Sequence, residues 1–228
     1  MQHLAIIPDG NRRWAKQNKL KTILGHQKGG QALKAAIDIC LKNSIKYLSI
    51  YTFSLENFNR SQEEQDYLFV QISDECKNNT SNLIQKKVRV KFIGQRELFP
   101  APTIKAINEI EALTKDFDTL TINFMFCYGG RQEIIQAVKN LSEDVKNGAI
   151  AAETIDEQVL RSYLWLDQTP DPDLIIRTSG ISRLSNFLTF QAAYSELMFL
   201  DCFWPEVTDE ILQTCIDKYL KIARNFGR

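Results

Sequence analysis

The feature that most constrains this chain is a series of short, almost wholly apolar runs that alternate with amphipathic stretches. Strand-like runs fall at residues 3–7, 47–53, 88–93, 120–126, 174–176 and 197–200. Helical patterns lie at 27–42, 61–86, 102–115, 130–147, 154–165 and 208–225. A strand that is buried on both faces is apolar throughout, whereas a half-exposed antiparallel strand alternates. The pattern predicts an α/β fold with a mostly parallel central sheet flanked by helices.

Nothing in the 228 residues marks a second domain. There is no internal repeat, low-complexity tract or linker rich in Pro and Gly, so we expect a single domain over residues 1–228. Lys plus Arg and Asp plus Glu both number 28, so the net charge does not favour nucleic acid as a partner. Five cysteines without a C-x-x-C pair and two histidines argue against a disulfide framework or structural zinc. A hard cation held by carboxylate stays open.

No apolar run approaches the roughly 18 residues that a membrane span needs. The N-terminal residues lack the basic stretch and apolar core of a signal peptide. We therefore expect a cytoplasmic protein that does not cross a bilayer.

Polar, charged and glycine residues come directly after four of the predicted strands. These segments are residues 8–13, 54–57, 128–131 and 177–180. In open α/β sheets the carboxyl ends of the strands share one edge, where helix N-termini also point and ligands bind. We expect the four segments to assemble one site.

The first segment combines a carboxylate, a glycine, an amide and two guanidinium groups. Asp9 can hold magnesium, which takes one or two protein carboxylates and completes its octahedron with phosphate oxygens and water. Arg12 and Arg13 can fork onto phosphate, and Gly10 allows close approach of the backbone. An alternative is that Asp9 or Asn11 caps the next helix and the arginines are solvated.

Two further segments carry weaker signals. The glycine-rich run at 25–30 offers free backbone amides, and His26 in it can donate to an anion, although it matches neither nucleotide-binding loop. The segment 53–60 places Ser54, Asn57 and Arg60 after a strand with aromatic residues between them. Capping of the following helix by Ser54 or Asn57 is the alternative there.

The loop at 177–187 has the composition of a diphosphate site. Arg177, Arg183 and hydroxyls such as Ser185 lie within a few residues of a glycine, and each guanidinium can take two oxygens at once. Glu196 follows soon after, and taken alone it fits an exposed surface position.

Taken in order, these segments resemble the cis-prenyltransferases, the undecaprenyl diphosphate synthases of bacteria and their dehydrodolichyl relatives, over nearly the whole chain. Residues 3–16 are similar to the family's H-x-A-I-I-M-D-G-N-x-R-W-A-K, 25–26 to G-H, 53–60 to F-S-x-E-N-W-x-R, 128–131 to Y-G-G-R and 177–187 to R-T-x-G-x-x-R-x-S-N-F. Residues 191–196 and Trp204-Pro205 extend the resemblance. Five ordered motifs make it specific.

The resemblance implies a magnesium-dependent enzyme that condenses isopentenyl diphosphate with an allylic diphosphate such as farnesyl diphosphate. The implied product is a long-chain polyprenyl diphosphate, such as undecaprenyl diphosphate, for a cell-wall lipid carrier. It also implies a homodimer and peripheral membrane contact on product release.

The resemblance also implies roles for individual residues. Asp9 would bind Mg²⁺, with Glu196 helping the metal and its water network, and Asn57 would act near the reacting carbons beside Ser54. The allylic diphosphate would be surrounded by Gly10, Asn11, Arg13, Lys21, His26 and Arg60. Isopentenyl diphosphate would be gripped by Arg177, Arg183 and Ser185. Further substrate-binding candidates in the same motifs are Arg12, Trp14, Glu56 and Phe58.

Some positions depart from the family pattern. Lys21 keeps a charge where many relatives have arginine but loses the bidentate fork, and Asn225 stands where the family often has an arginine. Apolar residues in 48–53, 67–72 and 122–126 are candidates for the walls of a product tunnel. The bulk of Phe124, Met125, Phe126 and Cys127 suggests a narrower tunnel and a shorter product.

Two other functions compete with this interpretation. A non-catalytic, diphosphate-binding subunit of a heteromeric prenyltransferase would explain the altered Asn225, but such relatives generally lose the aspartate motif that is present here. An unrelated phosphatase with Asp9 as nucleophile lacks companion motifs.

Overall fold

Six parallel strands form one sheet in the computed structural model, which describes residues 1–223. The strands are β1 (His3–Ile7), β2 (Tyr47–Ser54), β3 (Val88–Ile93), β4 (Leu120–Tyr128), β5 (Leu174–Arg177) and β6 (Glu196–Phe199). Their spatial order is β3-β4-β2-β1-β5-β6, and every neighbouring pair is parallel. The predicted α/β class and all six strands are confirmed. Strands such as β1 and β5 are buried throughout and leave an unbroken apolar pattern, whereas the outer strands β3 and β6 alternate in burial.

The helices in the described part are α1 (Asn11–Gln17), α2 (Thr22–Lys42), α3 (Gln62–Gln85), α4 (Ala101–Thr114), α5 (Gly130–Lys146), α6 (Glu157–Ser162) and α7 (Asp209–Tyr219). Helix α1 was not expected, because only Ala15 in it is buried and it shows no apolar stripe. Helix α2 begins at residue 22, not 27, and α6 is shorter than the predicted 154–165. Helix α7 ends at Tyr219, although the pattern predicted helix to residue 225.

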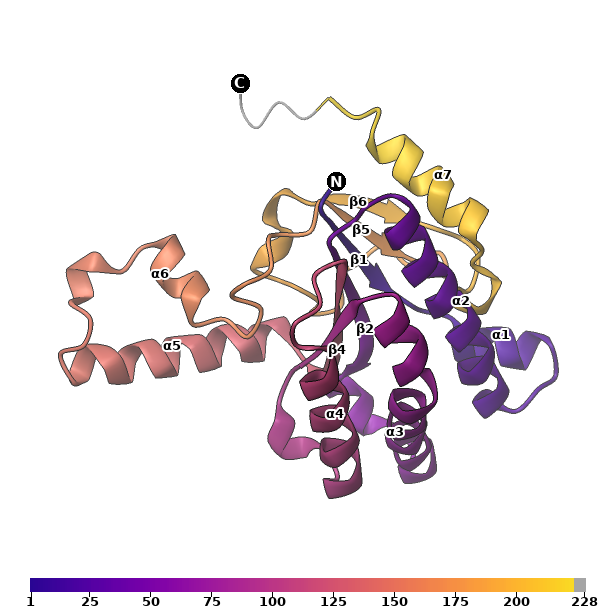
Figure 1. Cartoon of the computed structure of the whole chain (residues 1–228), viewed down its shortest axis with the longest axis horizontal. Coiled ribbons are helices and arrows are strands. Elements are labelled where there is room, and N and C mark those ends of the chain that lie inside the picture. The colour runs from indigo at the N-terminus through magenta and orange to yellow at the C-terminus, as the bar shows by residue number, and fades with distance from the viewer. Residues whose placement is uncertain (224–228) are drawn as a thin grey trace.

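The sheet has an apolar core on each face. On one face Leu4, Ile50 and Phe126 pack against α2, α3, α4 and α7. On the other face Ile7 and Met125 pack against Phe187 and neighbouring residues of the long segment that leads into and out of β5. Figure 1 shows α2, α3, α4 and α7 on the first side of the sheet. Both faces are thus covered, as an all-parallel sheet requires.

Helix α5 extends away from the body of the protein and carries α6 beside its far end (Figure 1). Ile135 and Val138 on α5 are about half exposed.

None of the helices in the described residues combines the length and the apolar character needed to span a membrane.

The strand order determines which loops meet. Strand β1 lies between β2 and β5, and Ile7 at its end is paired with Arg177 at the end of β5. Asp9 follows two residues after Ile7. The first and fourth predicted site segments therefore adjoin, although they are far apart in the sequence.

Candidate active site

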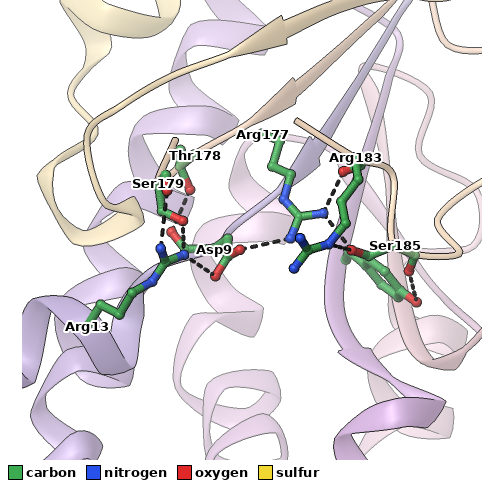
Figure 2. A network of polar contacts seen from close by, with 8 residues as sticks. Asp9, Arg13, Arg177, Thr178, Ser179, Arg183 and Ser185 are labelled. Atoms are coloured by element: carbon green, nitrogen blue, oxygen red, sulfur yellow. Dashed lines mark hydrogen bonds and ion pairs between the residues drawn. The ribbon is translucent and has the colours of Figure 1, made fainter. Parts of the chain in front are cut away.

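Asp9 lies between two arginines at the carboxyl edge of the sheet (Figure 2). Nη2 of Arg177 donates to one carboxylate oxygen of Asp9 at 2.9 Å, and Nη2 of Arg13 lies 3.2 Å from the other. Thr178 donates its hydroxyl to the backbone oxygen of Asp9 at 2.6 Å. The carboxylate is held from both sides while part of it stays exposed.

Opposing effects act on the pKa of the Asp9 carboxyl. Partial burial alone would raise the pKa, but hydrogen bonds and charge from Arg177 and Arg13 outweigh it and leave the pKa below its ordinary value. Asp9 is consequently ionised at neutral pH and available to a cation.

The backbone at Gly10 explains how α1 starts directly after the carboxylate. Gly10 has φ of 106°, in the left-handed region, and a Cβ there would lie 2.6 Å from Cδ1 of Phe203. Gly10 is itself the N-cap residue of α1, and no side chain caps this helix. The capping alternative for Asp9 and Asn11 is therefore wrong.

Arg13 is also fixed by the segment after β5. It donates to the backbone oxygen of Ser179 at 3.3 Å and to the Ser179 hydroxyl, and its guanidinium lies over the ring of Phe203, 5.6 Å from the centroid. Sequence reasoning overlooked Ser179 and Thr178, although both stand inside the R-T-x-G motif.

The loop after β5 is organised around Arg177, whose side chain is almost wholly buried. Its Nη1 donates to the backbone oxygen of Arg183 at 2.5 Å and to the hydroxyl of Ser185 at 2.7 Å. Arg183 donates from Nε to the same hydroxyl at 3.2 Å, and the Tyr51 hydroxyl donates to the backbone oxygen of Ser185 at 3.4 Å. Arg177, Arg183 and Ser185 are thus brought together beside Asp9, as the motif predicted.

A polar pocket of about 650 Å³ opens next to Asp9. Its walls include several of the residues that were expected around an allylic diphosphate: Asp9, Gly10, Asn11, Arg12, Arg13, His26 and Arg60. Asp9 is the only carboxylate among the residues that line it, and the other charged groups there are cationic. Such a pocket favours an anion together with a cation bound at Asp9.

Glu64 on α3 connects three of these cationic or polar side chains. Its carboxylate accepts from Arg60 at 3.0 Å and from His26 at 3.3 Å, and Nε of Arg12 lies 3.8 Å away. Sequence reasoning missed Glu64. The signal was the i,i+4 spacing of Arg60, just before α3, and Glu64 in the first turn of α3.

His26 does not lie in a free loop, contrary to expectation. The run at 25–30 is inside α2, which starts at Thr22, so the expected free amides are absent from it. Burial lowers the pKa of His26 despite the carboxylate of Glu64, so the ring is neutral near pH 7 and donates from Nε2 to Glu64.

The glycines of α2 serve packing. A Cβ on Gly25 would lie 2.2 Å from the backbone oxygen of Asn11, and one on Gly29 would lie 2.9 Å from the Trp204 ring. The glycines let α2 contact α1 and the segment before α7 closely.

The segment after β2 forms a short 3-10 helix, η1 (Leu55–Asn59), with Ser54 and Asn57 in a capping box. Oδ1 of Asn57 accepts from the backbone N–H of Ser54 at 3.1 Å. Phe58 packs edge-on against Phe53, with centroids 5.1 Å apart. The capping alternative is therefore what this structure shows for Ser54 and Asn57.

Glu56 connects η1 to the loop after β5. Its carboxylate accepts from Nδ2 of Asn186 at 3.0 Å, and Asn186 also accepts from the backbone N–H of Arg131 at 2.8 Å. Two of the four predicted segments therefore contact the loop after β5 at Asn186.

Other predicted site residues lie elsewhere. Lys21 is exposed and Trp14 half-buried, and neither lines the polar pocket. Glu196 is paired with Leu174 at the start of β5 and β6, whereas Asp9 follows the opposite end of β1. Within one chain, then, the structure does not bring Glu196 to Asp9, because Glu196 lies at the amino end of β6 and Asp9 follows the carboxyl end of β1. Asn225 lies outside the described residues.

An apolar pocket of about 300 Å³ continues from the polar one. It runs between α2 and α3 over the sheet, and Pro8, Asn11 and His26 line both pockets. Phe124 and Phe126 line it from the predicted set of bulky residues. Met125 belongs to the core on the other face, and Cys127 is not in the pocket wall. The expectation that all four bulky residues narrow the product tunnel is therefore wrong for Met125 and Cys127.

Two buried polar atoms at the site have no hydrogen-bond partner within the described residues, Oδ1 of Asn11 and Nε of Arg177. Buried polar atoms are normally paired, so these two indicate where a ligand would bind. No group of three or more potential metal-ligating His, Cys, Asp or Glu side chains occurs in residues 1–223. The donors at Asp9 suit an ion that shares its coordination with phosphate and water.

A family model described as undecaprenyl diphosphate synthase matches residues 7–227 of this chain. The isoprenyl transferase of Thermotoga maritima is 44% identical, with 99% of this chain and 96% of that protein covered. The farnesyl-diphosphate-specific ditrans,polycis-undecaprenyl-diphosphate synthase of Micrococcus luteus is 43% identical, covering 99% of this chain and 91% of its own.

The fold of this chain is also similar to that of solved structures. The crystal structure of lavandulyl diphosphate synthase from Lavandula x intermedia, in complex with dimethylallyl diphosphate, superposes with a TM-score of 0.97 at 31% identity. The match covers 100% of this chain and 98% of that one.

Proposed function

The chain belongs to the undecaprenyl diphosphate synthase family of prenyltransferases, and on this premise we propose that it adds isopentenyl diphosphate to an allylic diphosphate with cis geometry. The comparisons favour an enzyme over the non-catalytic alternative, since the relatives named above are enzymes and the match covers more than nine tenths of each. We propose farnesyl diphosphate as the allylic substrate, which is the specificity in the name of the Micrococcus luteus relative.

The observation that carries this proposal is the position of Asp9 between a cationic pocket and an arginine loop, at the mouth of an apolar pocket. A ligand with an anionic head and a hydrocarbon tail matches the shared wall of the two pockets. A second anion matches the loop of Arg177, Arg183 and Ser185. The site therefore has places for two diphosphates and one chain.

We assign the allylic diphosphate to the polar pocket, where Arg13, Arg60 and Asn11 can contact it. Isopentenyl diphosphate is assigned to the loop after β5. The fork of Arg177 already contacts both Asp9 and Ser185, so it lies where the two substrates would adjoin. Holding two reactants in one orientation contributes much of the acceleration of a two-substrate reaction.

Magnesium fits the single carboxylate of Asp9. A carboxylate offers about four acceptor positions, of which Arg177 and Arg13 occupy one each, so room remains for an ion. When bound, magnesium would offset the negative charge that develops on the departing diphosphate.

The chain's own groups would then act on the same charge. Arg13 and Arg60 donate to the leaving diphosphate as its carbon–oxygen bond breaks, and their positions are preset by Ser179 and Glu64. The double bond of isopentenyl diphosphate attacks the allylic carbon, and a proton is lost from the adduct. The apolar walls between α2 and α3 exclude water from the growing chain. A role for Asn57 near the reacting carbons stays a prediction.

The test is an incubation of the purified protein with farnesyl diphosphate, labelled isopentenyl diphosphate and magnesium, followed by extraction and sizing of the labelled product. We expect elongation that a chelator abolishes and excess magnesium restores. In Asp9→Ala the rate should fall by roughly 100-fold or more, because the ion and two arginines lose their shared partner.

Circular dichroism on Asp9→Ala would verify its fold. Absence of elongation by the folded wild-type protein with every short allylic primer would contradict the proposed function. Elongation that persists in chelator would contradict the metal requirement alone.

We propose that the protein is a homodimer, formed through the exposed side of β6 and the arm of α5. Leu197 and Phe199 on β6 are 44% and 38% exposed, and within the described residues β6 pairs with β5 alone. Ile135 and Val138 on α5 add further exposed apolar area. Apolar side chains at a sheet edge favour burial against a second copy of the same surface.

Cytoplasmic location and peripheral membrane contact stay predictions from the sequence. Sedimentation of the protein with vesicles, in the presence and absence of its own product, would test the second.

A further inference from the structure

The predicted segment 128–131 lies at the same edge of the sheet as the other three, but it lines neither of the two pockets. Its contacts go to the loop after β5. The backbone N–H of Gly130 donates to the backbone oxygen of Asn186 at 2.7 Å, and that of Arg131 donates to Oδ1 of Asn186 at 2.8 Å. These are the first two N–H groups of α5, which have no partner within the helix, and Gly129 at the N-cap has no side chain to accept from them. Asn186 accepts from both instead.

The glycines of the segment let the loop come this close. A Cβ on Gly129 would lie 2.8 Å from Nδ2 of Asn186, and a Cβ on Gly130 would lie 2.8 Å from the backbone nitrogen of Thr189. Such separations are too short for atoms that are not bonded, so a larger residue at either position would push the loop away. The two glycines therefore allow residues 186–189 to lie directly against the start of α5.

The side-chain amide of Asn186 also donates to its neighbours. Nδ2 donates to Oε1 of Glu56 on η1 and to Oε1 of Gln132 on α5, each at 3.0 Å. The amide thus uses both of its N–H groups and its oxygen. With its backbone oxygen included, Asn186 makes four hydrogen bonds, and they join the loop to η1 and α5.

Three residues of this loop have backbone conformations that non-glycine residues seldom adopt. The φ angles of Ser185, Asn186 and Leu188 are 51°, 65° and 43°, all in the left-handed region. Asparagine visits this region readily, but a larger side chain such as leucine is strained there. Strained backbone persists only where surrounding contacts hold it. The hydrogen bonds of Asn186 lie within the strained stretch and are placed to hold it.

Ser185, the residue before Asn186, is where the two arginines of the loop converge. Its hydroxyl accepts from Nη1 of Arg177 at 2.7 Å and from Nε of Arg183 at 3.2 Å, as Figure 2 shows. Arg183 is exposed, so this contact orients its guanidinium. Because one peptide unit joins Ser185 to Asn186, a change of backbone conformation at position 186 would move the hydroxyl and release Arg183.

We propose that Asn186 is a positioning residue for isopentenyl diphosphate, which acts through Ser185 and Arg183 and does not touch the substrate. The inference rests on the proposed function, in which this loop binds isopentenyl diphosphate. Donors that are already in place need no ordering when an anion binds, so their positions contribute to affinity. Without the contacts of Asn186 the loop relaxes to unstrained conformations, and binding must order it again. The affinity for isopentenyl diphosphate then falls, whereas the polar pocket is lined by other residues and keeps its affinity for the allylic diphosphate.

The experiment measures the steady-state kinetics of Asn186→Ala and Asn186→Gly, with each substrate varied in turn at saturating levels of the other and of magnesium. In both variants the KM for isopentenyl diphosphate should rise roughly tenfold or more, which is the effect of losing one or two hydrogen bonds. The KM for farnesyl diphosphate and kcat should stay within about threefold of wild type, because contacts remote from the reacting carbons bind the ground state and the transition state alike.

The glycine variant separates the amide from the backbone. Glycine adopts a positive φ without strain but offers no amide, so a raised KM in Asn186→Gly would assign the effect to the side-chain contacts. A wild-type KM for isopentenyl diphosphate in Asn186→Gly would overturn the proposal. So would an equal rise in the KM for farnesyl diphosphate, since a general disturbance of the site would produce it.

A rescue by a second substitution tests the contact with Glu56. Asn186→Asp keeps an oxygen for the N–H of Arg131 but sets a carboxylate against that of Glu56, so the KM for isopentenyl diphosphate should rise as in Asn186→Ala. Adding Glu56→Gln removes one charge and supplies an amide donor, which should return the KM to within about threefold of wild type. No recovery in the folded double variant would overturn the proposal. If neither Asn186→Ala nor Asn186→Gly folds, this pair of variants decides.

Asn43→Ala is the matched control. Asn43 is a half-buried asparagine at the end of α2, and its Nδ2 donates to the backbone oxygen of Ile39 at 2.9 Å and to Oε1 of Gln213 on α7 at 3.0 Å. The substitution removes comparable hydrogen bonds away from the site, so it should lower stability and leave the KM for isopentenyl diphosphate unchanged. An equal rise of that KM in the control would overturn the proposal, because the effect would then follow from stability alone.

Failure of the proposed function has a different signature, since wild type would then form no elongated product at all. If only the role of Asn186 is wrong, wild type elongates its substrate and the KM for isopentenyl diphosphate does not respond to substitutions at position 186.

Discussion

His3 lies fully buried at the start of β1, in a polar network that crosses the sheet. Its Nδ1 donates to the backbone oxygen of Pro170 at 2.7 Å, since a carbonyl can only accept, and its Nε2 accepts from the hydroxyl of Ser49 at 2.8 Å. Asn123 donates to the same hydroxyl at 3.2 Å. Burial, which outweighs nearby carboxylates, lowers the pKa of His3 to about 4. The ring is neutral in the folded protein.

Stability should accordingly depend on pH through His3. The unfolded chain binds a proton near pH 6.5 and the folded protein only near pH 4, so the free energy of unfolding should fall as the pH drops between these values. The loss of unfolding free energy that comes from His3 over this pH range is about 3 kcal/mol. Urea denaturation from pH 7 to pH 4 would measure it as the difference between wild type and His3→Gln.

Comparison with the variant is necessary because other groups also make the stability depend on pH. As the pH falls, the raised pKa of buried Glu133 increases the free energy of unfolding, whereas the lowered pKa of His26 decreases it, as that of His3 does. Neither changes in His3→Gln. A slope with pH as steep in the variant as in wild type would contradict the prediction.

Arg177 should be irreplaceable by lysine. Its guanidinium contacts Asp9, Ser185 and the backbone of Arg183 simultaneously, which an ammonium cannot do from one position. With charged hydrogen bonds worth roughly 1.5–3 kcal/mol each, Arg177→Lys should lower kcat/KM for isopentenyl diphosphate roughly 100-fold. Arg89→Lys on β3 is the matched control, and equal effects of the two substitutions would count against the role of Arg177.

At the scale of elements, the packing of α1 on α2 depends on the glycine-rich run. Alanine is the better helix former by about 1 kcal/mol, yet a Cβ at position 25 would collide with the backbone oxygen of Asn11. We expect Gly25→Ala to lower the free energy of unfolding by roughly 1–3 kcal/mol through overpacking.

Gly30→Ala in the same helix provides the contrast. A Cβ there would meet only Oε1 of Glu75, at 3.8 Å, so this substitution should stabilise the protein by up to about 1 kcal/mol. Urea denaturation of both variants would measure the two effects. Equal effects would mean that the α1–α2 contact does not require glycine at position 25.

At the scale of the whole molecule, the exposed side of β6 should determine the oligomeric state. Leu197→Asp/Phe199→Asp places charges on the proposed dimer surface and should shift the protein to a monomer in sedimentation velocity. Val70→Asp on α3 alters a residue of 58% exposure outside that surface and should leave the dimer intact. A monomeric wild type, or a dimer that tolerates both aspartates, would exclude this interface.

The sequence alone determined the class of fold and the edge of the sheet at which the site lies. Fully buried parallel strands such as β1 and β5 require apolar residues on both faces, and polar residues such as Asp9 and Arg177 follow them directly. These are local properties, so the pattern of the chain carries them. It also predicted the grouping of Arg177, Arg183 and Ser185, which share one loop.

Only the tertiary structure decided which distant groups meet. The strand order brings β1 beside β5 and so joins Asp9 to Arg177 across 168 positions of sequence. The packing of α2 along α3 brings Glu64 to His26 and Lys86 to Asp38. The parallel direction of the strands puts Glu196 at the opposite edge from Asp9. Such contacts depend on the burial of whole elements against one another, because a local pattern sets which face of a helix is apolar but not which neighbour covers it.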